Sequence, residues 1–230
     1  TFPTSGSCNS WRLMPNRGNY LGRPMIHATC ATVPIPLDGN LGNWRKAVPV
    51  TFSGRAHAGH PRHATVYAMW DAAHLYLAFD VYSSRLQARV REHHGDKLWW
   101  DDGVEFLIDA QRHGTKEYLP DDFCYHINIL NAVYEDRGTA SGEPDCTWTG
   151  SARHAVKIFD DYHYLIEVAV PWEEIGVDAV VGQTSIGADF CVNGTDPETG
   201  KYSYFDWCHL SAFHDPSGFG ELVLQDPLSS

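Results

Sequence analysis

Apolar and polar residues alternate with a period of two in a series of short runs along this chain. In residues 74–82, for example, Leu75, Leu77, Phe79 and Val81 form one apolar face. Side chains two residues apart share a face of a β-strand, so this spacing predicts strands rather than helices. We expect about nine strands. The clearest runs are 65–70, 74–82, 102–109, 122–130, 152–159, 162–170, 185–193 and 219–225.

Turn-forming residues separate these runs. Residues 71–73 predict a hairpin between their two flanking strands. One short helix is expected at PWEEIG, 171–176, where proline precedes an acidic first turn and glycine ends it. The charged stretch 83–94 is expected to form a short helix or a solvated loop. Short strands with hardly any helix predict an all-β fold, an antiparallel β-sandwich of jelly-roll type.

Residues 1–31 lack this periodicity and are rich in Gly, Pro, Asn and Ser. We expect them to form an irregular N-terminal arm, packed on a single domain of residues 32–230 and pinned to it by cysteines. Without a CxxC pair, zinc ribbons and thioredoxin-like redox chemistry are disfavoured, and three disulfides are favoured over buried free thiols. The simplest pairing joins neighbours in chain order. The cysteines are Cys8, Cys30, Cys124, Cys146, Cys191 and Cys208.

The chain has 17 Lys and Arg against 29 Asp and Glu, for a formal net charge of −12. This balance argues against nucleic acid or an anionic membrane as a partner and favours a neutral ligand or a cation. No apolar run approaches the roughly 20 residues that cross a bilayer. With the expected disulfides, we predict a secreted, extracellular, monomeric protein. The segment Asn193–Thr195 matches a glycosylation sequon, relevant in a eukaryotic source.

A carboxylate lies in the middle of one predicted strand. In LWWDDGVEFLID, residues 98–109, Glu105 is flanked by apolar residues on both sides. Phe106 and the residues two positions away on either side form the core face, so Glu105 points to the opposite face of the sheet.

The run YHINI, residues 125–129, places His126 and Asn128 on a non-core face in the same way. If the two strands are neighbours, these side chains converge with Glu105. Donors and acceptors beside the ring of Trp99 are suited to a sugar, whose hydroxyls need hydrogen bonds and whose C–H face favours an aromatic plate. The alternative is the solvated face of an antiparallel sheet, where polar residues are ordinary.

Seven motifs occur in an order that resembles carbohydrate-binding module family 9 and its family-9-like relatives. They are IPLDGNLGNW, VYAMWDAAHLYLAFDV, LWWDDGVEFLID, YHINILNAVYED, YLIEVAVPWEEIG, IGADFCVNGTD and FHDPSGFGELVL, and they span about Val33 to Leu224. The resemblance implies a β-sandwich of antiparallel sheets and structural calcium in some members. It also implies a shallow slot that holds the end of a glycan chain between two aromatic side chains.

On this resemblance, Trp99 matches one wall of the aromatic clamp and Phe213 the other. Glu105 matches the family's strand glutamate. His126 matches a basic residue, and Asn128 follows it. These residues are therefore expected to bind a polysaccharide or oligosaccharide.

Three positions depart from family members that grip the reducing ends of glucans and xylans. Those members tend to have Trp where this chain has Phe213, Arg where it has His126, and a polar residue where it has Cys191. Stacking on Phe is weaker than on Trp, and His titrates near neutrality. The identity of the glycan, and whether its ends or its interior are bound, stay open.

Histidines form a second group of candidates. His57, His60 and His63 are spaced in H-x2-H-x2-H, and His93 and His94 lie together. Imidazoles could hold zinc or copper. Residues three apart do not lie on the same face of a strand, however, and Gly59 and Pro61 predict a turn in this segment. A solvated loop is therefore the preferred interpretation.

Acidic residues raise two further alternatives. Asp101, Asp102 and Asp38 could be calcium ligands, or simply solvated edge residues. Asp102 and Glu105 could be a glycosidase acid and base pair, but they project from opposite faces of one strand and cannot flank one bond.

The alternative functions are a haem b or metal-binding redox domain on the same sandwich, with Met69 as a candidate haem ligand, or a metal-dependent enzyme acting on polysaccharide. We favour Met69 as ordinary core packing. The preferred prediction is non-catalytic carbohydrate binding, either by a free protein or by a module of a larger glycan-degrading enzyme.

Overall fold

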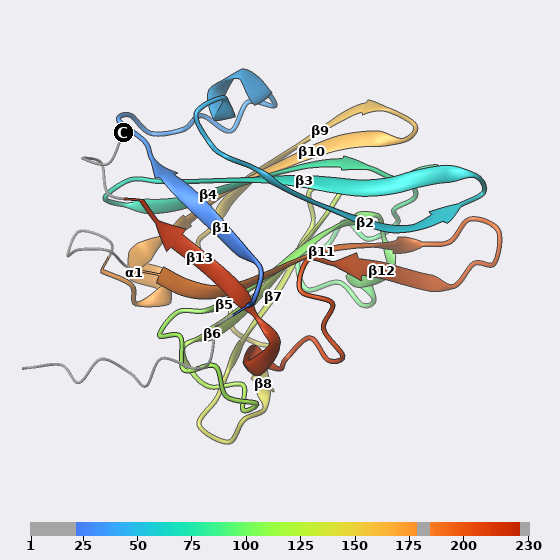
Figure 1. Ribbon diagram of the computed structural model, residues 1–230. Coiled ribbons are helices and arrows are strands. Elements are labelled where there is room, and N and C mark those ends of the chain that lie inside the picture. Colours follow the sequence, from blue (N-terminus) through green and yellow to red (C-terminus); the bar gives the residue numbers. More distant parts are fainter. Residues whose placement is uncertain (1–21, 179–184, 226–230) are drawn as a thin grey trace, which may run out of the picture.

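The computed structural model describes residues 22–178 and 185–225, and most of its regular structure is β-strand (Figure 1). The short helical segments are η1 (Leu41–Trp44), η2 (Leu98–Trp100), α1 (Trp172–Ile175) and η3 (Pro216–Gly218). The strands are β1 (Met25–Cys30), β2 (Val50–His57), β3 (His60–Trp70), β4 (His74–Tyr82), β5 (Gly103–Asp109), β6 (Asp122–Asn128), β7 (Val133–Gly138), β8 (Pro144–Asp145), β9 (Arg153–Asp160), β10 (His163–Pro171), β11 (Ser185–Thr195), β12 (Tyr202–Asp206) and β13 (Gly220–Leu224).

The strands form two layers packed face to face (Figure 1). The first sheet has the order β8-β7-β6-β5-β11-β13-β1, with β12 also paired to β11. The second has the order β1-β3-β4-β10-β9, with β2 also paired to β3. The predicted all-β sandwich is therefore confirmed, as are the β3–β4 hairpin and the helix after β10.

Strand β1 belongs to both sheets and runs parallel to both of its neighbours. Met25 to Ala28 pair with β13, and Thr29 and Cys30 pair with the end of β3. The prediction of an irregular arm up to residue 31 is wrong for these six residues. Only Ile26 and Ala28 of β1 are buried, and two alternations are too few to stand out in a sequence. Residues 1–21 of the arm lie outside the described residues.

The main core lies between the layers. The alternating face predicted in 74–82 is buried, and Phe79 of β4 contacts Phe106 of β5 and Phe190 of β11 at centroid distances of 6.0 and 5.8 Å. Phe106 stacks in turn on Tyr125 of β6 at 4.7 Å. Residue types that alternate along these strands therefore separate the core from the outer faces.

Residues 31–47 cover the outer face of the second sheet. Trp44 is fully buried, and its Nε1 donates a hydrogen bond of 2.8 Å to Glu167 Oε1, while Gly39 N donates one of 2.6 Å to Oε2. Gly39 has a φ of +73°, a conformation that favours glycine. Met69 packs in this cluster with 2% of its surface exposed, consistent with the core role we favoured over haem ligation.

The cysteine pairing in chain order is not observed within the described residues. Cys124, Cys146, Cys191 and Cys208 are free, so neither of their two expected bonds is formed. The reason is local: Cys124 is buried on β6, where its thiol donates to Glu105, and Cys146 is exposed. A bond between Cys8 and Cys30 involves Cys8, which lies outside the described residues.

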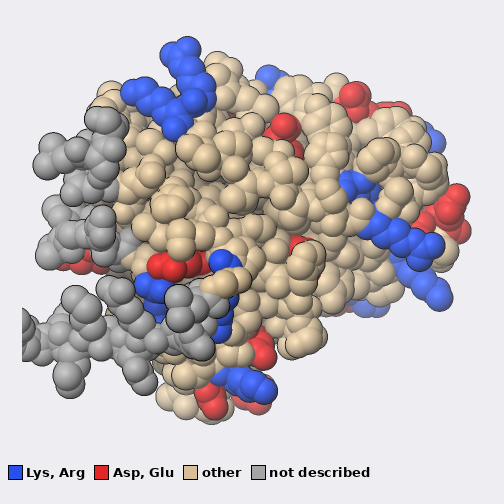
Figure 2. All heavy atoms as spheres, in the orientation of Figure 1, with Lys and Arg blue, Asp and Glu red and all other residues tan. Residues whose placement is uncertain are grey.

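The surface shows no basic face in the view of Figure 2, where acidic and basic side chains are interspersed. Among the described residues, no helix is long and apolar enough to cross a membrane. The stretch 83–94 forms a loop without helix, one of the two forms expected for it.

Candidate functional site

A cavity of about 440 Å³ opens on the outer face of the first sheet. We call it the aromatic cavity. Four of the five predicted ligand residues line it, although they come from segments far apart in the chain. The lining residues are Trp99, Glu105, His126, Tyr134, Asp136, Pro144, Cys146, Tyr202, Ala212, Phe213 and His214.

Two neighbouring strands supply the floor. Glu105 of β5 and His126 of β6 are directly opposite each other in the antiparallel register, which confirms that these side chains converge. His126 Nε2 lies 3.2 Å from Glu105 Oε1. The face is not the solvated side of a sheet, because Glu105 is only 2% exposed and His126 only 8%. The carboxylate is held there by partners rather than by water.

A third strand completes this network. Asn193 of β11 donates from Nδ2 to Glu105 Oε2 at 3.2 Å, and its amide nitrogen lies 3.3 Å from His126 Nδ1. Because Asn193 Nδ2 can only donate, His126 accepts at Nδ1 and donates from Nε2 to Glu105. Tyr202 of β12 donates to Asn193 Oδ1 at 2.7 Å. Asn193 is only 1% exposed, so the sequon there is not an accessible glycan acceptor.

The network keeps Glu105 ionised. Burial alone would raise the pKa of Glu105, but the hydrogen bond from His126, with hydrogen bonds from Asn193 and the Cys124 thiol, holds the pKa below its ordinary value. Burial also raises the pKa of Tyr202, so its phenol stays protonated. The floor thus presents a fixed negative acceptor with one lone pair of Oε2 not used by the protein.

Aromatic side chains form the walls. Trp99, in η2, contacts Tyr134 of β7 edge to face, with ring centroids 5.6 Å apart. Phe213, in the loop before η3, contacts Tyr204 of β12 edge to face at 4.7 Å. Both predicted clamp residues are partly exposed and both line the cavity. Their rings are therefore available to a ligand.

The cavity is also lined by His214 and by the buried Asp136. His214 Nε2 lies 3.5 Å from Asp136 Oδ1. Burial acts to lower the pKa of His214, but the hydrogen bond and charge of Asp136 outweigh it and hold that pKa above its ordinary value. The cavity therefore offers an imidazole donor beside carboxylate acceptors to hydroxyl groups.

Asn128 departs from its predicted role, because the protein uses its whole amide. Its Nδ2 donates to Val90 O at 2.8 Å and to Asp101 Oδ2 at 2.9 Å, and its Oδ1 accepts from the backbone N–H groups of Leu130 and Ala132. Asn128 is fully buried and does not line the aromatic cavity. It holds the loop that precedes η2.

The three carboxylates considered for calcium also have other partners. Asp101 accepts from the N–H groups of Arg89 and Val90, and Asp102 accepts from Gln87 N and Ser83 Oγ. Asp38 accepts from Asn40 N and Asn43 Nδ2 at an exposed turn. Burial raises the pKa of Asp102 to about 7, which weakens it as a cation ligand. Calcium at these residues stays a prediction.

The H-x2-H-x2-H segment is a β-hairpin rather than a solvated loop. His57 ends β2 and lies 3.2 Å from Arg62 Nη1, while His60 and His63 of β3 stack on Tyr162 and Tyr82. The Ala58–Gly59 turn between the strands has positive φ angles of 48° and 78°. The three imidazoles therefore have separate partners.

Other side chains do lie close enough to hold a transition metal. Two such groups share Cys124: one with Glu105 and His126, the other with Asp136 and His214. Burial raises the pKa of Cys124 well above its ordinary value, so the thiol is protonated, and the other groups already bond one another. The remaining groups within the described residues are His93, His94 and Glu135, and Asp109, His113 and Asp121.

Tyr134, Tyr202 and Asn193 are the functional residues that the sequence did not reveal. Tyr202 and Tyr134 lie on strands, β12 and β7, that were not predicted. Asn193 alternates with core residues of β11, as Glu105 does on β5, and that pattern could have identified it.

Comparison with known proteins gives one family. The model for the carbohydrate family 9 binding domain-like proteins matches residues 37–227. Endo-1,4-beta-xylanase C of Paenibacillus barcinonensis is 28% identical over 214 residues, which cover 91% of this chain and 18% of that protein. The chain thus spans less than a fifth of the length of the curated relatives it matches.

Two solved structures of a carbohydrate-binding module family 9 from Caldicellulosiruptor kristjanssonii share the fold. The one in complex with glucose has a TM-score of 0.69 and 19% identity, and the match covers 90% of this chain and 98% of that chain. The one in complex with cellotriose has a TM-score of 0.67 and 20% identity, covering 88% and 94%.

Proposed function

Because this chain belongs to the carbohydrate family 9 binding domain-like family, we propose that it binds carbohydrate without chemically altering it. The observation that carries the proposal is the aromatic cavity, where Trp99 and Phe213 form walls over the acceptor Glu105. The ligand is a polysaccharide or oligosaccharide whose sugar ring enters this cavity.

The chemistry of the cavity favours a neutral sugar. Aromatic walls suit the C–H faces of a pyranose, and a few fixed polar groups suit its hydroxyls. Glu105 accepts, while the phenol of Tyr134 and the imidazole of His214 can donate. Its volume of about 440 Å³ falls in the range of small-molecule sites, roughly 300 to 1,000 Å³. A cavity of this size accommodates one glycosyl unit of a chain between its aromatic walls.

Binding without catalysis is favoured by the placement of the carboxylates. Glu105 accepts hydrogen bonds from three protein donors. Asp102 accepts a hydrogen bond from the loop that precedes η2, and it does not line the cavity. A glycosidase needs an acid and a base on either side of one bond. The pair considered from the sequence does not provide that arrangement.

The substitution Trp99→Ala tests the proposal. Losing one aromatic wall should weaken glycan affinity by about tenfold or more, corresponding to on the order of 1 to 2 kcal/mol. Calorimetry on a panel of soluble glucan and xylan oligosaccharides, with affinity electrophoresis on the polymers, measures it. Phe159→Ala is the matched control, since Phe159 is an exposed aromatic of β9 in the second sheet, 42% exposed.

Unchanged affinity in Trp99→Ala, with a normal unfolding midpoint, would remove Trp99 from the site. Release of new reducing ends by the wild-type protein would instead favour an enzyme.

We place the domain outside the cell, because a plant or microbial polysaccharide is met there, and we expect it to act as a monomer. The similarity to part of a xylanase supports a role as a module of a polysaccharide-degrading enzyme. Structural calcium stays a prediction, which unfolding midpoints with and without chelator test. Haem b or copper also stays a prediction, which an absorption spectrum of the purified protein tests.

A further inference from the structure

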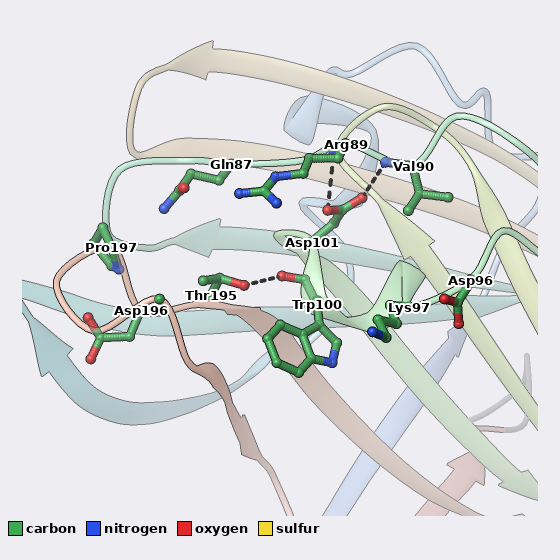
Figure 3. Close-up of a pocket in the computed structure, with 11 residues that line it drawn as sticks. Gln87, Arg89, Val90, Asp96, Lys97, Trp100, Asp101, Thr195, Asp196 and Pro197 are labelled. Atoms are coloured by element: carbon green, nitrogen blue, oxygen red, sulfur yellow. Dashed lines mark hydrogen bonds between the residues drawn. The ribbon is translucent and has the colours of Figure 1, made fainter.

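A second cavity, of about 380 Å³, lies next to the aromatic cavity. We call it the side cavity. Figure 3 shows the Trp100 ring and Lys97 on one side of it, Gln87 and Arg89 on the opposite side, Thr195 between them, and Asp196 with Pro197 at one end. The family resemblance assigns no ligand residue here.

The two cavities share a wall. Trp99 lines the aromatic cavity and the next residue, Trp100, lines the side cavity. Tyr202 lines the aromatic cavity and stacks on the Trp100 ring, with centroids 6.1 Å apart and planes at 27°. A row of rings therefore continues from Phe213 through Tyr204 and Tyr202 to Trp100, with successive centroids 4.7, 5.7 and 6.1 Å apart.

The Trp100 ring is exposed but its backbone is fixed. Its side chain has 40% of its surface exposed, which is unusual for tryptophan. Its carbonyl accepts from Thr195 Oγ1 at 2.6 Å, and its N–H donates to Lys97 O at 2.9 Å. Lys97 Nζ lies 6.0 Å from the ring centroid, at the outer limit of a cation–π contact, so this flexible side chain does not close the ring face.

The opposite wall is equally ordered. Asp101 is only 6% exposed and binds the backbone N–H groups of Arg89 and Val90, as the dashed lines in Figure 3 show. This carboxylate fixes the loop that carries Arg89 over the cavity. Because the loop is already ordered, ligand binding there costs little conformational entropy.

The charges of the side cavity are mixed. Arg89 and Lys97 offer donors, and Asp96 and Asp196 offer acceptors, so neither an anion nor a cation is strongly favoured. One exposed ring among donors and acceptors of both kinds is the chemistry that recognises a neutral, hydroxyl-rich ring.

We propose that the side cavity is a second glycosyl subsite, which holds a neutral sugar unit of the same chain whose neighbouring unit occupies the aromatic cavity. This inference rests on the proposed function. It predicts that the domain recognises a segment of several units, with Tyr202 beneath the linkage between the two subsites.

Affinity as a function of chain length tests the proposal. Calorimetry would use cello- and xylo-oligosaccharides of one to four units with the wild type, Trp100→Ala, Trp100→Phe and the control Phe159→Ala. In the better-bound wild-type series, affinity should rise about tenfold or more between one and three units, as expected for one additional stacked ring. Trp100→Ala should abolish that rise while keeping the affinity for one unit, and Trp100→Phe should restore part of it.

The outcomes separate the two proposals. If wild-type protein binds no sugar, the proposed function fails; if it binds sugar and Trp99→Ala binds like the wild type, Trp99 is not part of the site. If the wild type binds and Trp100→Ala shows the same rise with length, the second subsite is excluded. Equal weakening for all lengths in Trp100→Ala would also exclude it, because the ring would then only support the aromatic cavity. Near-ultraviolet circular dichroism confirms that each variant is folded.

Discussion

Glu105 is the most constrained side chain of the aromatic cavity. Its two carboxylate oxygens receive hydrogen bonds from His126, Asn193 and Cys124, and it is almost completely buried. A buried carboxylate is tolerated only with such partners, since an unpaired charge in the interior costs several kcal/mol. The residue therefore orients the floor of the cavity whether or not a ligand is present.

Asn128 and Glu105 should respond in opposite ways to substitution. Asn128→Ala should lower the free energy of unfolding by about 2 to 4 kcal/mol, because it leaves buried partners without their amide. A folded Asn128→Ala protein should keep its glycan affinity within about threefold, since Asn128 does not line the cavity. Glu105→Gln should weaken binding by about tenfold or more, because its amide NH2 must face a donor of the floor, either Asn193 or His126. Urea unfolding and calorimetry measure both quantities.

Loss of affinity in Asn128→Ala as large as in Glu105→Gln would contradict this assignment and return Asn128 to the ligand site.

At this scale, the period of two predicted which face each residue occupies but not what it contacts. Glu105 and His126 share a face and also face a cavity. Asn128 shares that face too, yet it lies at the end of β6, where the chain turns and the backbone needs its amide. The face on which a side chain lies is decided within its own strand. The residues that it contacts come from segments distant in the sequence.

At the level of elements, Gly103 determines how closely β5 can approach β6. A Cβ at this position would lie 2.8 Å from the Cα of Asn128 and would also strike the carbonyl oxygen of Ile127. Both are backbone atoms that cannot rotate away. The glycine in LWWDDGVEFLID thus permits the register that places Glu105 opposite His126.

Gly103→Ala should lower the free energy of unfolding by more than about 2 kcal/mol, because the strands must separate locally. It should also weaken glycan binding, since the floor spans these strands. Gly59→Ala is the control: Gly59 has a φ of +78° and open space around it, so it should cost only about 1 kcal/mol and leave binding unchanged. If both substitutions lowered the free energy of unfolding equally, the close approach of β5 and β6 would not be what requires glycine at position 103.

Sequence periodicity identified the long buried strands but missed the short or polar ones. All eight ranges named from the sequence overlap an observed strand. The missed strands are β1, β2, β7, β8 and β12; four of them have six residues or fewer, and β2 has eight residues of which only two are buried. They are stabilised by pairing to a neighbour rather than by a long apolar face of their own. Since β7 and β12 carry Tyr134 and Tyr202, half of the aromatic lining was missed with them.

For the whole molecule, buried carboxyl groups make stability depend on pH. Burial raises the pKa of Asp102 and of Asp122 to about 7, and that of Asp189 to about 8. Each group binds its proton more tightly in the folded than in the unfolded chain. Its contribution to stability is complete at low pH and is lost as pH rises through the folded pKa.

The free energy of unfolding should therefore fall as pH rises from about 5 toward 8 and level off above about 8, with a slope on the order of 1 kcal/mol per pH unit for each proton that only the folded chain holds. His113 and His214, whose pKa values are held high by nearby carboxylates despite burial, act in the same direction. Histidines whose pKa values are lowered by burial, such as His57, act in the opposite direction below about pH 6.5, because the unfolded chain then binds a proton that the folded chain lacks. Thermal unfolding by calorimetry at several pH values measures it.

Asp189→Asn provides the control, because it removes one of the three titrations and should make the slope shallower. An Asp189→Asn protein with the same slope as the wild type between pH 5 and 8 would contradict the assignment of Asp189 as a protonated group.

Strand β1 gives the sandwich a mechanical property. Because β1 and β13 run side by side in the same direction, tension applied near residues 22 and 225 pulls the two strands lengthwise past each other. All of their backbone hydrogen bonds then resist together, as in shear, instead of opening one at a time as in a zipper. Force spectroscopy should show a higher rupture force for this geometry than for pulling at the β2–β3 turn and residue 225. A domain anchored to an insoluble polymer while a tethered partner is dragged by flow would hold its shape under that load.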